Sequence, residues 1–216
     1  MTMGEAIYSC GPSVPPEGIK ETLGMISGKL GARKTRMLDL GDLKPAAVAL
    51  PLLVCGGELS ILFTVRTDKV EHHKSEISFP GGRVDSTDRD DVAAALRETF
   101  EEIGTPPAAV HVLGRLDDFH SISGYRVRPF AVFLSDERPA FAPHPGEVSE
   151  IITIPVSHLV DSSNHSLGEI LDMHGNRLNY FKWENKVVWG LTGAILRHFL
   201  ELTFDFRPGE DERRGE

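Results

Sequence analysis

The stretch "GGRVDSTDRDDVAAALRETFEEIGT", residues 81–105, decides the fold of this 216-residue chain. Its second half spaces apolar side chains three and four residues apart, which predicts an amphipathic helix packed against a sheet. The members of this stripe are Val92, Ala95, Leu96, Thr99, Phe100 and Ile103. Gly104 stands where a left-handed residue would end the helix, and Pro106 prevents the helix from resuming. The N-cap is expected from one of three residues, namely Ser86, Thr87 or Asp88.

Three glutamates lie on nearly the opposite side of the same predicted helix. Glu98, Glu101 and Glu102 fall within an arc of about 100° when positions are placed on a helical wheel. Like charges this close repel one another, and each carboxyl then tends to retain its proton. A hard divalent cation such as Mg²⁺ or Mn²⁺ removes the repulsion, because it prefers oxygen ligands. The alternative is a solvated acidic face with Arg97 as a neighbouring counter-charge.

This stretch resembles the Nudix box, the loop–helix–loop signature of the Nudix hydrolases. The family pattern is a glycine, five residues, a glutamate, seven residues, and then Arg-Glu-aliphatic-x-Glu-Glu-x-Gly-aliphatic. The functional positions that match in register are Arg97, Glu98, Glu101, Glu102 and Gly104. Counted from Gly82, Asp88 stands where the pattern has glutamate, and one extra residue precedes the helix. Thr99 and Thr105 occupy positions that are usually aliphatic.

The resemblance implies an α+β fold, a Nudix-type α/β/α sandwich around a mixed β-sheet with a loop–helix–loop catalytic motif. It also implies a hydrolase that depends on Mg²⁺ or Mn²⁺ and cleaves the pyrophosphate bond of a nucleoside diphosphate derivative. By this resemblance Glu98, Glu101 and Glu102 hold the metal ions, and Arg97 orients the glutamates by salt bridging. Two glycines before the helix, Gly81 and Gly82, would let the backbone approach the substrate closely.

The upstream segment "LFTVRTDKVEHHKSEISFPGGRVD", residues 62–85, resembles the coenzyme A pyrophosphatase branch of the family. The residues that match this branch in register are Leu62, Thr64, Arg66, Phe79, Pro80, Gly81 and Gly82. The resemblance implies that coenzyme A or its thioesters are cleaved to 3′,5′-ADP and (acyl-)phosphopantetheine. Glu71 and Ser75 depart from the branch pattern, which has arginine and glycine there. ADP-ribose or another nucleotide diphosphate derivative is therefore an alternative substrate, and a catalytically silent nucleotide sensor is an alternative function.

Other candidate site residues lie outside the helix. Arg66 is expected either to contact a substrate phosphate or to be a surface residue at a strand end. A general base often lies outside the box in this family, and Glu147, in "HPGEVSEIITIPV", is the candidate, with Glu150 as its competitor. For both glutamates a solvated loop acid is the alternative. Three aromatic residues could stack on a base but are expected to pack in a core or interface instead, namely Trp183, Trp189 and Tyr180.

The rest of the chain reads as one domain that is mostly strands. An apolar run at 46–55 and its partner at 59–66 flank a Gly-Gly turn and predict a hairpin. Further strands are predicted at 110–116, 125–135, 150–156 and 176–183, with helices at 17–30 and 187–202. The expected division is an N-terminal arm with a possible short helix, the Nudix hydrolase domain and a polar tail, at residues 1–45, 46–204 and 205–216.

Composition narrows the class of partner and the compartment. The net charge of −9 argues against a general nucleic-acid-binding surface, which needs a basic footprint. The two cysteines, Cys10 and Cys55, do not suggest a disulfide framework, and neither a signal peptide nor a membrane span is evident. We therefore expect a cytoplasmic protein whose partner is a small nucleotide substrate, with a homodimer through residues 16–30 as one possibility.

Overall fold

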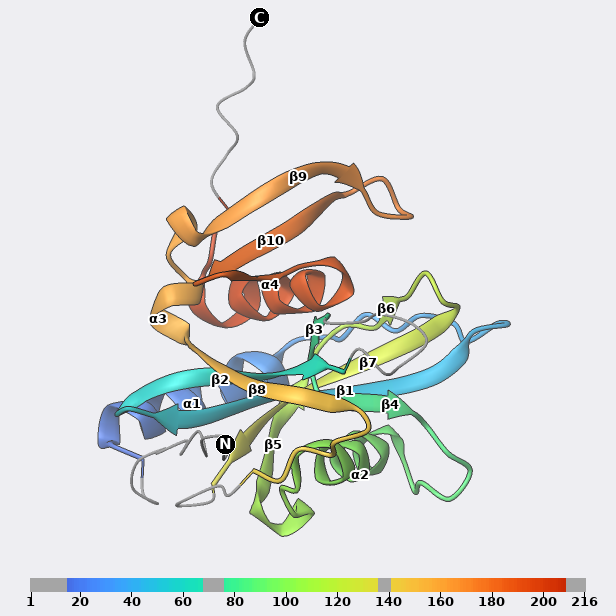
Figure 1. The fold of residues 1–216 in the computed structure, drawn as a ribbon, viewed down its shortest axis with the longest axis horizontal. Helices are drawn as coiled ribbons and strands as arrows, with labels where there is room; N and C mark the ends of the chain where they lie inside the picture. The colour runs from blue at the N-terminus through green and yellow to red at the C-terminus, as the bar shows by residue number, and fades with distance from the viewer. Residues whose placement is uncertain (1–14, 68–75, 136–140, 209–216) are drawn as a thin grey trace, which may run out of the picture.

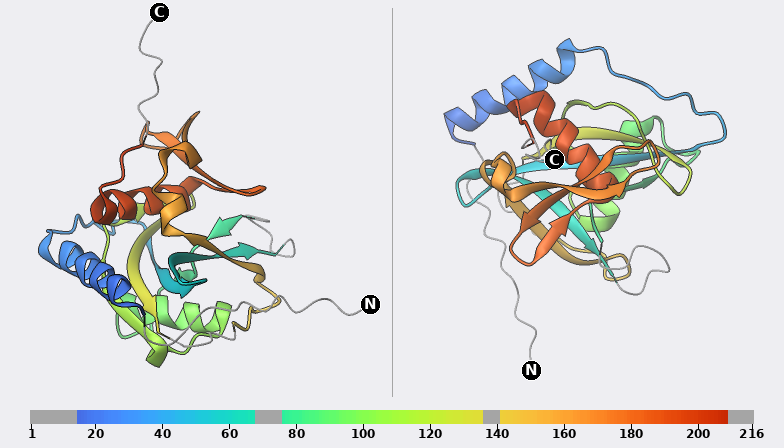
Figure 2. Two further views of the ribbon diagram at one scale, coloured as in Figure 1. Left: turned by 90° about the vertical axis from the view of Figure 1, so that its left-hand side faces the viewer. Right: turned by 90° about the horizontal axis from the view of Figure 1, so that it is seen from above.

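The computed structural model describes residues 15–67, 76–135 and 141–208. Figures 1 and 2 show a central sheet between helices, with a second, smaller sheet beyond α4. The helices are α1 (Glu17–Ala32), α2 (Asp91–Ile103), α3 (Val156–Leu159) and α4 (Gly190–Phe204), with 3-10 turns at Pro107–Ala109 and Ser162–Asn164. The strands are β1 (Lys44–Cys55), β2 (Glu58–Arg66), β3 (Ile77–Ser78), β4 (Gly81–Arg83), β5 (Val110–Arg115), β6 (Phe119–His120), β7 (Tyr125–Leu134), β8 (Val148–Pro155), β9 (His165–Leu171), β10 (Arg177–Trp183) and β11 (Lys186–Val188).

The central sheet is mixed, as predicted. Strand β1 runs parallel to β7, while the pairings of β1 with β2 and of β2 with β8 are antiparallel. The sheet follows the order β3-β2-β1-β7-β5, with β4, β6 and β8 added beside this path. The predicted hairpin is confirmed, because Cys55 faces Glu58 across the turn and both turn glycines have positive φ angles. The predicted strands at 110–116, 125–135 and 176–183 are confirmed as β5, β7 and β10.

The geometry of the sheet edge comes from the separation of β1 and β2. Strand β1 pairs with β2 over residues 52–55 and with β4 over residues 46–48. Strand β3 pairs with the far end of β2, at Thr64 and Val65. Residues 77–83 therefore lie where the two long strands separate, and the Ala49 amide donates a hydrogen bond to the Pro80 carbonyl at 2.8 Å. This places Gly81 and Gly82 at the edge of the sheet that faces α2.

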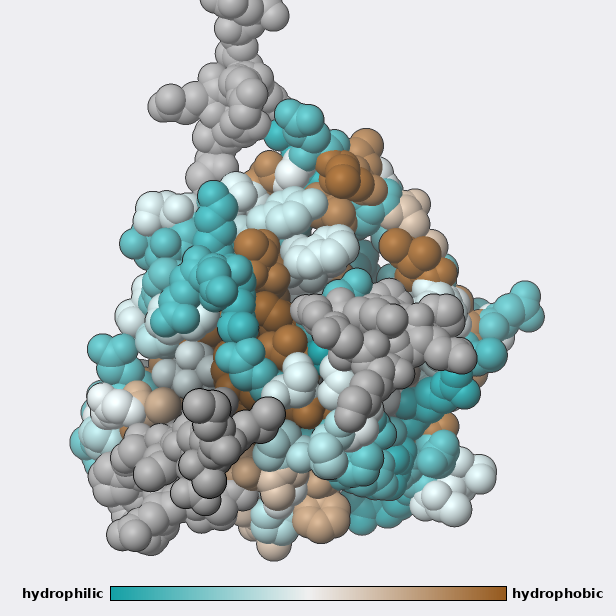
Figure 3. All heavy atoms as spheres, in the orientation of Figure 1, coloured by the Kyte–Doolittle hydropathy of each residue, from teal (hydrophilic) through white to brown (hydrophobic). Residues whose placement is uncertain are grey.

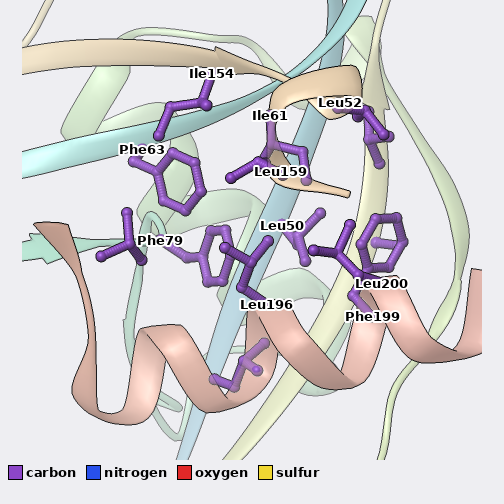
Figure 4. Packing of buried hydrophobic residues seen from close by; sticks show 14 of the residues in the cluster. Leu50, Leu52, Ile61, Phe63, Phe79, Ile154, Leu159, Leu196, Phe199 and Leu200 are labelled. Atoms are coloured by element: carbon purple, nitrogen blue, oxygen red, sulfur yellow. The ribbon is translucent and has the colours of Figure 1, made fainter. Parts of the chain in front are cut away.

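Both faces of the central sheet are covered, which explains the unbroken apolar run in β1. On one face, α1 and α4 pack against side chains such as Leu50 and Phe63. Figure 4 shows Leu196 and Phe199 of α4 pointing at this layer. On the other face, α2 packs through small side chains against β1, where Ala47 is fully buried. The arrangement is the predicted α/β/α sandwich.

A smaller antiparallel sheet, β9-β10-β11, lies on the other side of α4, and the sequence pattern predicted only its middle strand. Residues 187 and 188 were predicted as the start of the closing helix, and this is wrong, because they belong to β11. The hairpin pairs Phe181 with Val188, and the helix begins only at Gly190, whose φ of 63° interrupts the backbone. Among the described residues no helix has the length and apolar character needed to cross a membrane.

Helix α2 begins and ends at defined caps. Asp90 is the N-cap, and its carboxylate accepts a hydrogen bond from the Ala93 amide at 2.8 Å. The expectation of Ser86, Thr87 or Asp88 as N-cap is therefore wrong, since the loop continues two residues further. The C-cap prediction is confirmed, because Gly104 is left-handed, with φ 77°, and its amide donates to the Phe100 carbonyl.

Gly104 is predicted to be required for the stability of the site helix. In Gly104→Ala, the added methyl would sit 2.9 Å from the Ala142 Cβ on a left-handed backbone. We expect the free energy of unfolding in urea to fall by about 2 kcal/mol. Gly24→Ala is the matched control, because Gly24 is an exposed helical position in α1 with no atom near the added methyl. The control is expected to gain up to about 1 kcal/mol, and equal losses in both variants would contradict the prediction.

Candidate active site

Helix α2 buries a different arc from the one its apolar spacing predicted. Phe100, expected in the buried stripe, is 51% exposed, whereas Glu102, expected on the exposed acidic face, is only 4% exposed. Thr99 and Ile103 are fully buried as predicted. The helix is thus rotated so that Glu102 turns toward the edge of the sheet, where glycines leave room for it.

Gly81 and Gly82 form the floor on which two of the glutamates rest. The Gly81 amide points at Glu102 Oε1 at 3.5 Å, and a Cβ added to Gly82 would lie 2.5 Å from the Glu98 carboxylate. A Cβ on Gly81 would meet the Ala47 carbonyl oxygen at 2.5 Å. Any larger residue would push the carboxylates off the sheet edge, so both glycines are needed for this close approach.

Arg97 collects the acidic groups around one guanidinium. Its Nε and Nη2 donate to the two oxygens of Asp88, each at 3.0 Å. Its Nη1 donates to Glu98 at 2.8 Å and to Glu101 at 3.0 Å, and Nη2 also donates to the Arg83 carbonyl. The hydrogen bonds from Arg97 hold the pKa of Asp88 below its usual range, and Asp88 in turn raises the pKa of Arg97. Asp88 therefore makes the contact with Arg97 although its side chain is shorter than the glutamate of the Nudix pattern.

Burial makes two of the carboxyls reluctant to ionise. Desolvation raises the pKa of Glu102 to about 8, although the Gly81 amide and the charge of Arg66 oppose this. Desolvation also raises the pKa of Glu98, against the lowering effect of Arg97. The charges of Glu98 and Glu147 raise the pKa of Glu102 further. The surroundings of Glu98 and Glu102 therefore disfavour their charged forms, a condition that a divalent ion bound to their oxygens would relieve.

The donor set fits a hard divalent cation. Glu98, Glu101 and Glu102 offer only carboxylate oxygens, the ligand type that Mg²⁺ and Mn²⁺ prefer. In the part of the chain that is described, no three His, Cys, Asp or Glu side chains converge closely enough to enclose an ion. The reason is visible in the contacts, because Arg97 holds Glu98 and Glu101 while Glu102 lies under Gly81. Metal binding would draw these carboxylates together in competition with Arg97.

Arg66 lies at the end of β2, close enough to Glu102 for its charge to lower the pKa of that carboxyl. Its Nε is buried and has no hydrogen-bond partner within the described residues. A buried guanidinium nitrogen without an acceptor is costly, and a phosphate oxygen is an acceptor it would favour. Arg66 is half-buried at the last residue of β2, and the unpartnered Nε favours the phosphate contact over the alternative of a strand-end surface residue.

The segment that carries Glu147 docks on the C-terminus of α2. The amides of Ala142 and His144 donate to the carbonyls of Ile103 and Glu102, each at 2.9 Å. These bonds satisfy helix carbonyls that have no intrahelical partner. The Thr67 amide donates to the Glu147 carbonyl at 3.0 Å, which ties the segment to the end of β2 as well. The Glu147 charge is felt at both Glu98 and Glu102.

Glu150 is placed differently from its competitor. Its carboxylate accepts a hydrogen bond from Lys186 Nζ at 2.8 Å, so its charge is compensated by β11. The Glu147 carboxylate is half-exposed, and its only described ion contact is His144 Nδ1 at 4.0 Å. The structure thus brings Glu147, Arg66 and the α2 glutamates together and gives Glu150 a structural partner.

Sequence reasoning missed the residues that fix the first turn of α2. Arg128 on β7 donates to Asp91, the first residue of the helix, and to Asp118 at 3.1 Å. Arg115 also donates to Asp118, at 2.5 Å. Arg128 and Asp91 lie in different elements, and no local sequence pattern predicts that they pair. The docking of residues 142–148 had one available signal, since a glycine-capped helix leaves carbonyls that a following segment can satisfy.

The front face of the molecule is hydrophilic around this site. Figure 3 shows teal side chains gathered at lower right, over α2 and the loop that leads into it from β4. The acidic members of that loop include Asp85, Asp88 and Asp90. The face agrees with a polar, water-accessible substrate.

Comparison with known proteins gives consistent matches. The NUDIX domain model matches residues 43–172. The chain is 36% identical over 160 residues to proteins of Yersinia pestis and Yersinia pseudotuberculosis named "Uncharacterized Nudix hydrolase NudL", covering 72% of this chain and 78% of each relative. A structure from Deinococcus radiodurans aligns with a TM-score of 0.48 and 15% identity, over 71% of this chain and 81% of that one. A C. elegans Ap4A hydrolase aligns with a TM-score of 0.45 and 18% identity, over 52% and 80%.

Burial of Glu102 predicts a distinctive pH dependence of stability in metal-free buffer. The folded-state pKa of about 8 lies above the unfolded value of 4.5, so the folded protein binds more protons between these values. The free energy of unfolding should therefore fall as pH rises through this window. Glu102→Gln removes the penalty and should be more stable than the wild type above pH 8 by on the order of a few kcal/mol.

Urea unfolding with EDTA, followed across this pH range, measures the effect. Glu101→Gln is the matched control, because it neutralises a carboxylate of the same helix that is half-exposed. This control should keep the pH slope of the wild type. Parallel pH profiles for the wild type and Glu102→Gln would show that Glu102 is not buried as the structure has it.

Proposed function

The chain belongs to the Nudix hydrolase family, and we propose that it hydrolyses coenzyme A or its thioesters at their pyrophosphate bond. The products would be 3′,5′-ADP and phosphopantetheine or its acylated form. The observation that carries the proposal is the buried Glu102 beneath the Gly81 amide, next to Glu98 on a helix whose arginine holds the acidic groups together. Carboxylates buried together without enough counter-charge lower the stability of the fold, but they can bind a cation.

We assign Glu98, Glu101 and Glu102 as the ligands of Mg²⁺ or Mn²⁺. A bound ion of this kind supplies charge neutralisation on the phosphates and a more acidic attacking water. Arg97 orients Glu98 and Glu101 through its Nη1 and keeps their oxygens on one side of the helix. Gly81 and Gly82 let the backbone lie directly against Ala47 and the Glu98 carboxylate, so no side chain at these positions would stand between the carboxylates and the pyrophosphate.

Two further residues act on the substrate and the water in this proposal. Arg66 would donate its unpartnered Nε–H to a phosphate oxygen and so hold the pyrophosphate beside Glu102. Glu147 would accept the proton of the attacking water, because its carboxylate is half-exposed and lies within electrostatic range of both Glu98 and Glu102. The ion pair of Glu150 with Lys186 favours Glu147 over Glu150 for this role.

The choice of coenzyme A rests on the match of residues 62–82 to that branch of the family. Within the described residues, Arg66 and the two glycines of the match lie at the site, whereas Phe79 is buried in the core against Phe63. The departures at Glu71 and Ser75 fall outside the described residues. Because these two departures bear on the choice of substrate, the assay below includes other nucleotide diphosphate derivatives.

A product assay distinguishes the substrates. With Mg²⁺ or Mn²⁺, coenzyme A should be cleaved faster than ADP-ribose, NADH, a dinucleoside polyphosphate or capped RNA, with products separated by chromatography. Glu102→Gln should lower the rate by about a thousandfold, since a metal ion supplies several kcal/mol and each 1.4 kcal/mol is tenfold. Cleavage of another member of the panel would discard coenzyme A. Binding without any cleavage would overturn the hydrolase assignment in favour of a sensor.

The proposal also separates the two candidate bases. Glu147→Gln should lower kcat by on the order of a hundredfold or more with little change in KM, because a general base contributes 10²–10⁴. It should also flatten the acidic limb of the pH–rate profile. Glu150→Gln, three residues away and of the same chemistry, is the control, and it should retain most activity. The reverse order of effects would reassign the base to Glu150.

A further inference from the structure

The outer face of the small sheet carries two aromatic rings in one orientation. Tyr180 on β10 and Trp189 after β11 are cross-strand neighbours, because Phe181 pairs with Val188. Their ring planes differ by 6° and their centroids are 6.3 Å apart. Trp189 is 43% exposed, so of the two packing roles expected for it, in a core or in an interface, the core is wrong. In Figure 3 pale side chains of intermediate hydropathy are exposed in this region, over β10 and the start of α4.

The pair is fixed in place by the sheet itself. A Cβ added to Gly168 on β9 would lie 2.3 Å from Tyr180 Cε2, so the tyrosine ring rests directly on the glycine backbone. Trp189 is anchored at the N-cap of α4, where its carbonyl accepts a hydrogen bond from the Gly193 amide at 3.1 Å. Rings already ordered in the free protein lose little entropy when a flat ligand stacks on them.

The small sheet is joined to the edge of the active site. Strand β11 lies against β3, and Lys186 Nζ bonds Glu150 Oε2 on β8 at 2.8 Å. From Ser78, at the end of β3, three further residues lead to Gly81, a span of at most about 11 Å. The hairpin that carries the aromatic pair therefore contacts the strand that leads directly to Gly81.

We propose that the surface formed by Tyr180 and Trp189 stacks on the purine base of the substrate while the α2 carboxylates take its pyrophosphate. The inference rests on the proposed function and adds the subsite that recognises the nucleotide. A base has a flat, uncharged face, which suits exposed rings on a chain of net charge −9. Lys182, exposed on the same face of β10, adds a positive charge beside the rings that suits the phosphate groups of a nucleotide.

A binding experiment tests the surface formed by Tyr180 and Trp189 without any catalysis. The chain has two tryptophans, and Trp183→Phe leaves Trp189 as the sole tryptophan, whose emission is excited selectively at wavelengths that tyrosine does not absorb. In EDTA, AMP should quench its fluorescence with a saturable curve, whereas ribose 5-phosphate, which lacks the base, should not. Absence of quenching by AMP, or equal quenching by both probes, would overturn the proposal. Circular dichroism verifies that the Trp183→Phe protein is folded.

Kinetics supply an independent reading. Trp189→Ala should raise KM for the adenine-containing substrate about tenfold with kcat little changed, as expected for loss of a stacking contact. Trp189→Phe keeps a ring and should recover most of the affinity, and Trp183→Phe should leave KM unchanged. An unchanged KM in folded Trp189→Ala would contradict base stacking on Tyr180 and Trp189, even if the protein is a hydrolase. Quenching by AMP in a protein that cleaves no member of the panel would sink the hydrolase function and leave the base site intact.

Discussion

The site depends on one guanidinium. Arg97 donates hydrogen bonds to the carboxylates of Asp88, Glu98 and Glu101 and to the Arg83 carbonyl. These bonds hold the loop before α2 against the helix. Without that cation, the carboxylates of one helix turn would repel one another across a few ångströms. Because the arginine is shared among several acids, it organises them without fully compensating any one of them. The residual negative charge is what makes the place suitable for a metal ion.

The sheet edge supplies the second constraint. Strands β1 and β2 separate, and the segment that fills the gap brings the Gly81 and Gly82 backbone against the helix. Glycine is needed there because a Cβ would occupy the volume of the Glu98 carboxylate or of the Ala47 carbonyl. The same proximity buries Glu102, whose raised pKa follows from desolvation. Fold and electrostatics of the site are thus consequences of one close backbone approach.

Much of this could be predicted from the sequence. Apolar periodicity gave the main strands and α2, and the Arg-Glu-x-x-Glu-Glu spacing gave the charged constellation. The rotation of α2 could not be predicted in this way, because the apolar Phe100 is exposed and the charged Glu102 is buried, the reverse of what their hydropathy suggests. Thr99 is a comparable case, since its buried hydroxyl is satisfied by the Ala95 carbonyl at 2.7 Å. Strands β9 and β11 were missed because β9 is largely exposed, without a clear alternation of buried side chains, and β11 is only three residues long.

Placement of the general base illustrates what tertiary structure adds. Glu147 and Glu150 are three residues apart and equivalent in sequence, yet only the first lies on a segment held by the free carbonyls of α2. Any shift of α2 that moves its carboxylates would therefore carry Glu147 with it. Glu150 instead is tied to β11 through Lys186, and so to the small sheet and its aromatic pair. Two acids three residues apart, one just before β8 and one within it, thus connect to two different parts of the fold, α2 and the sheet that we propose reads the base.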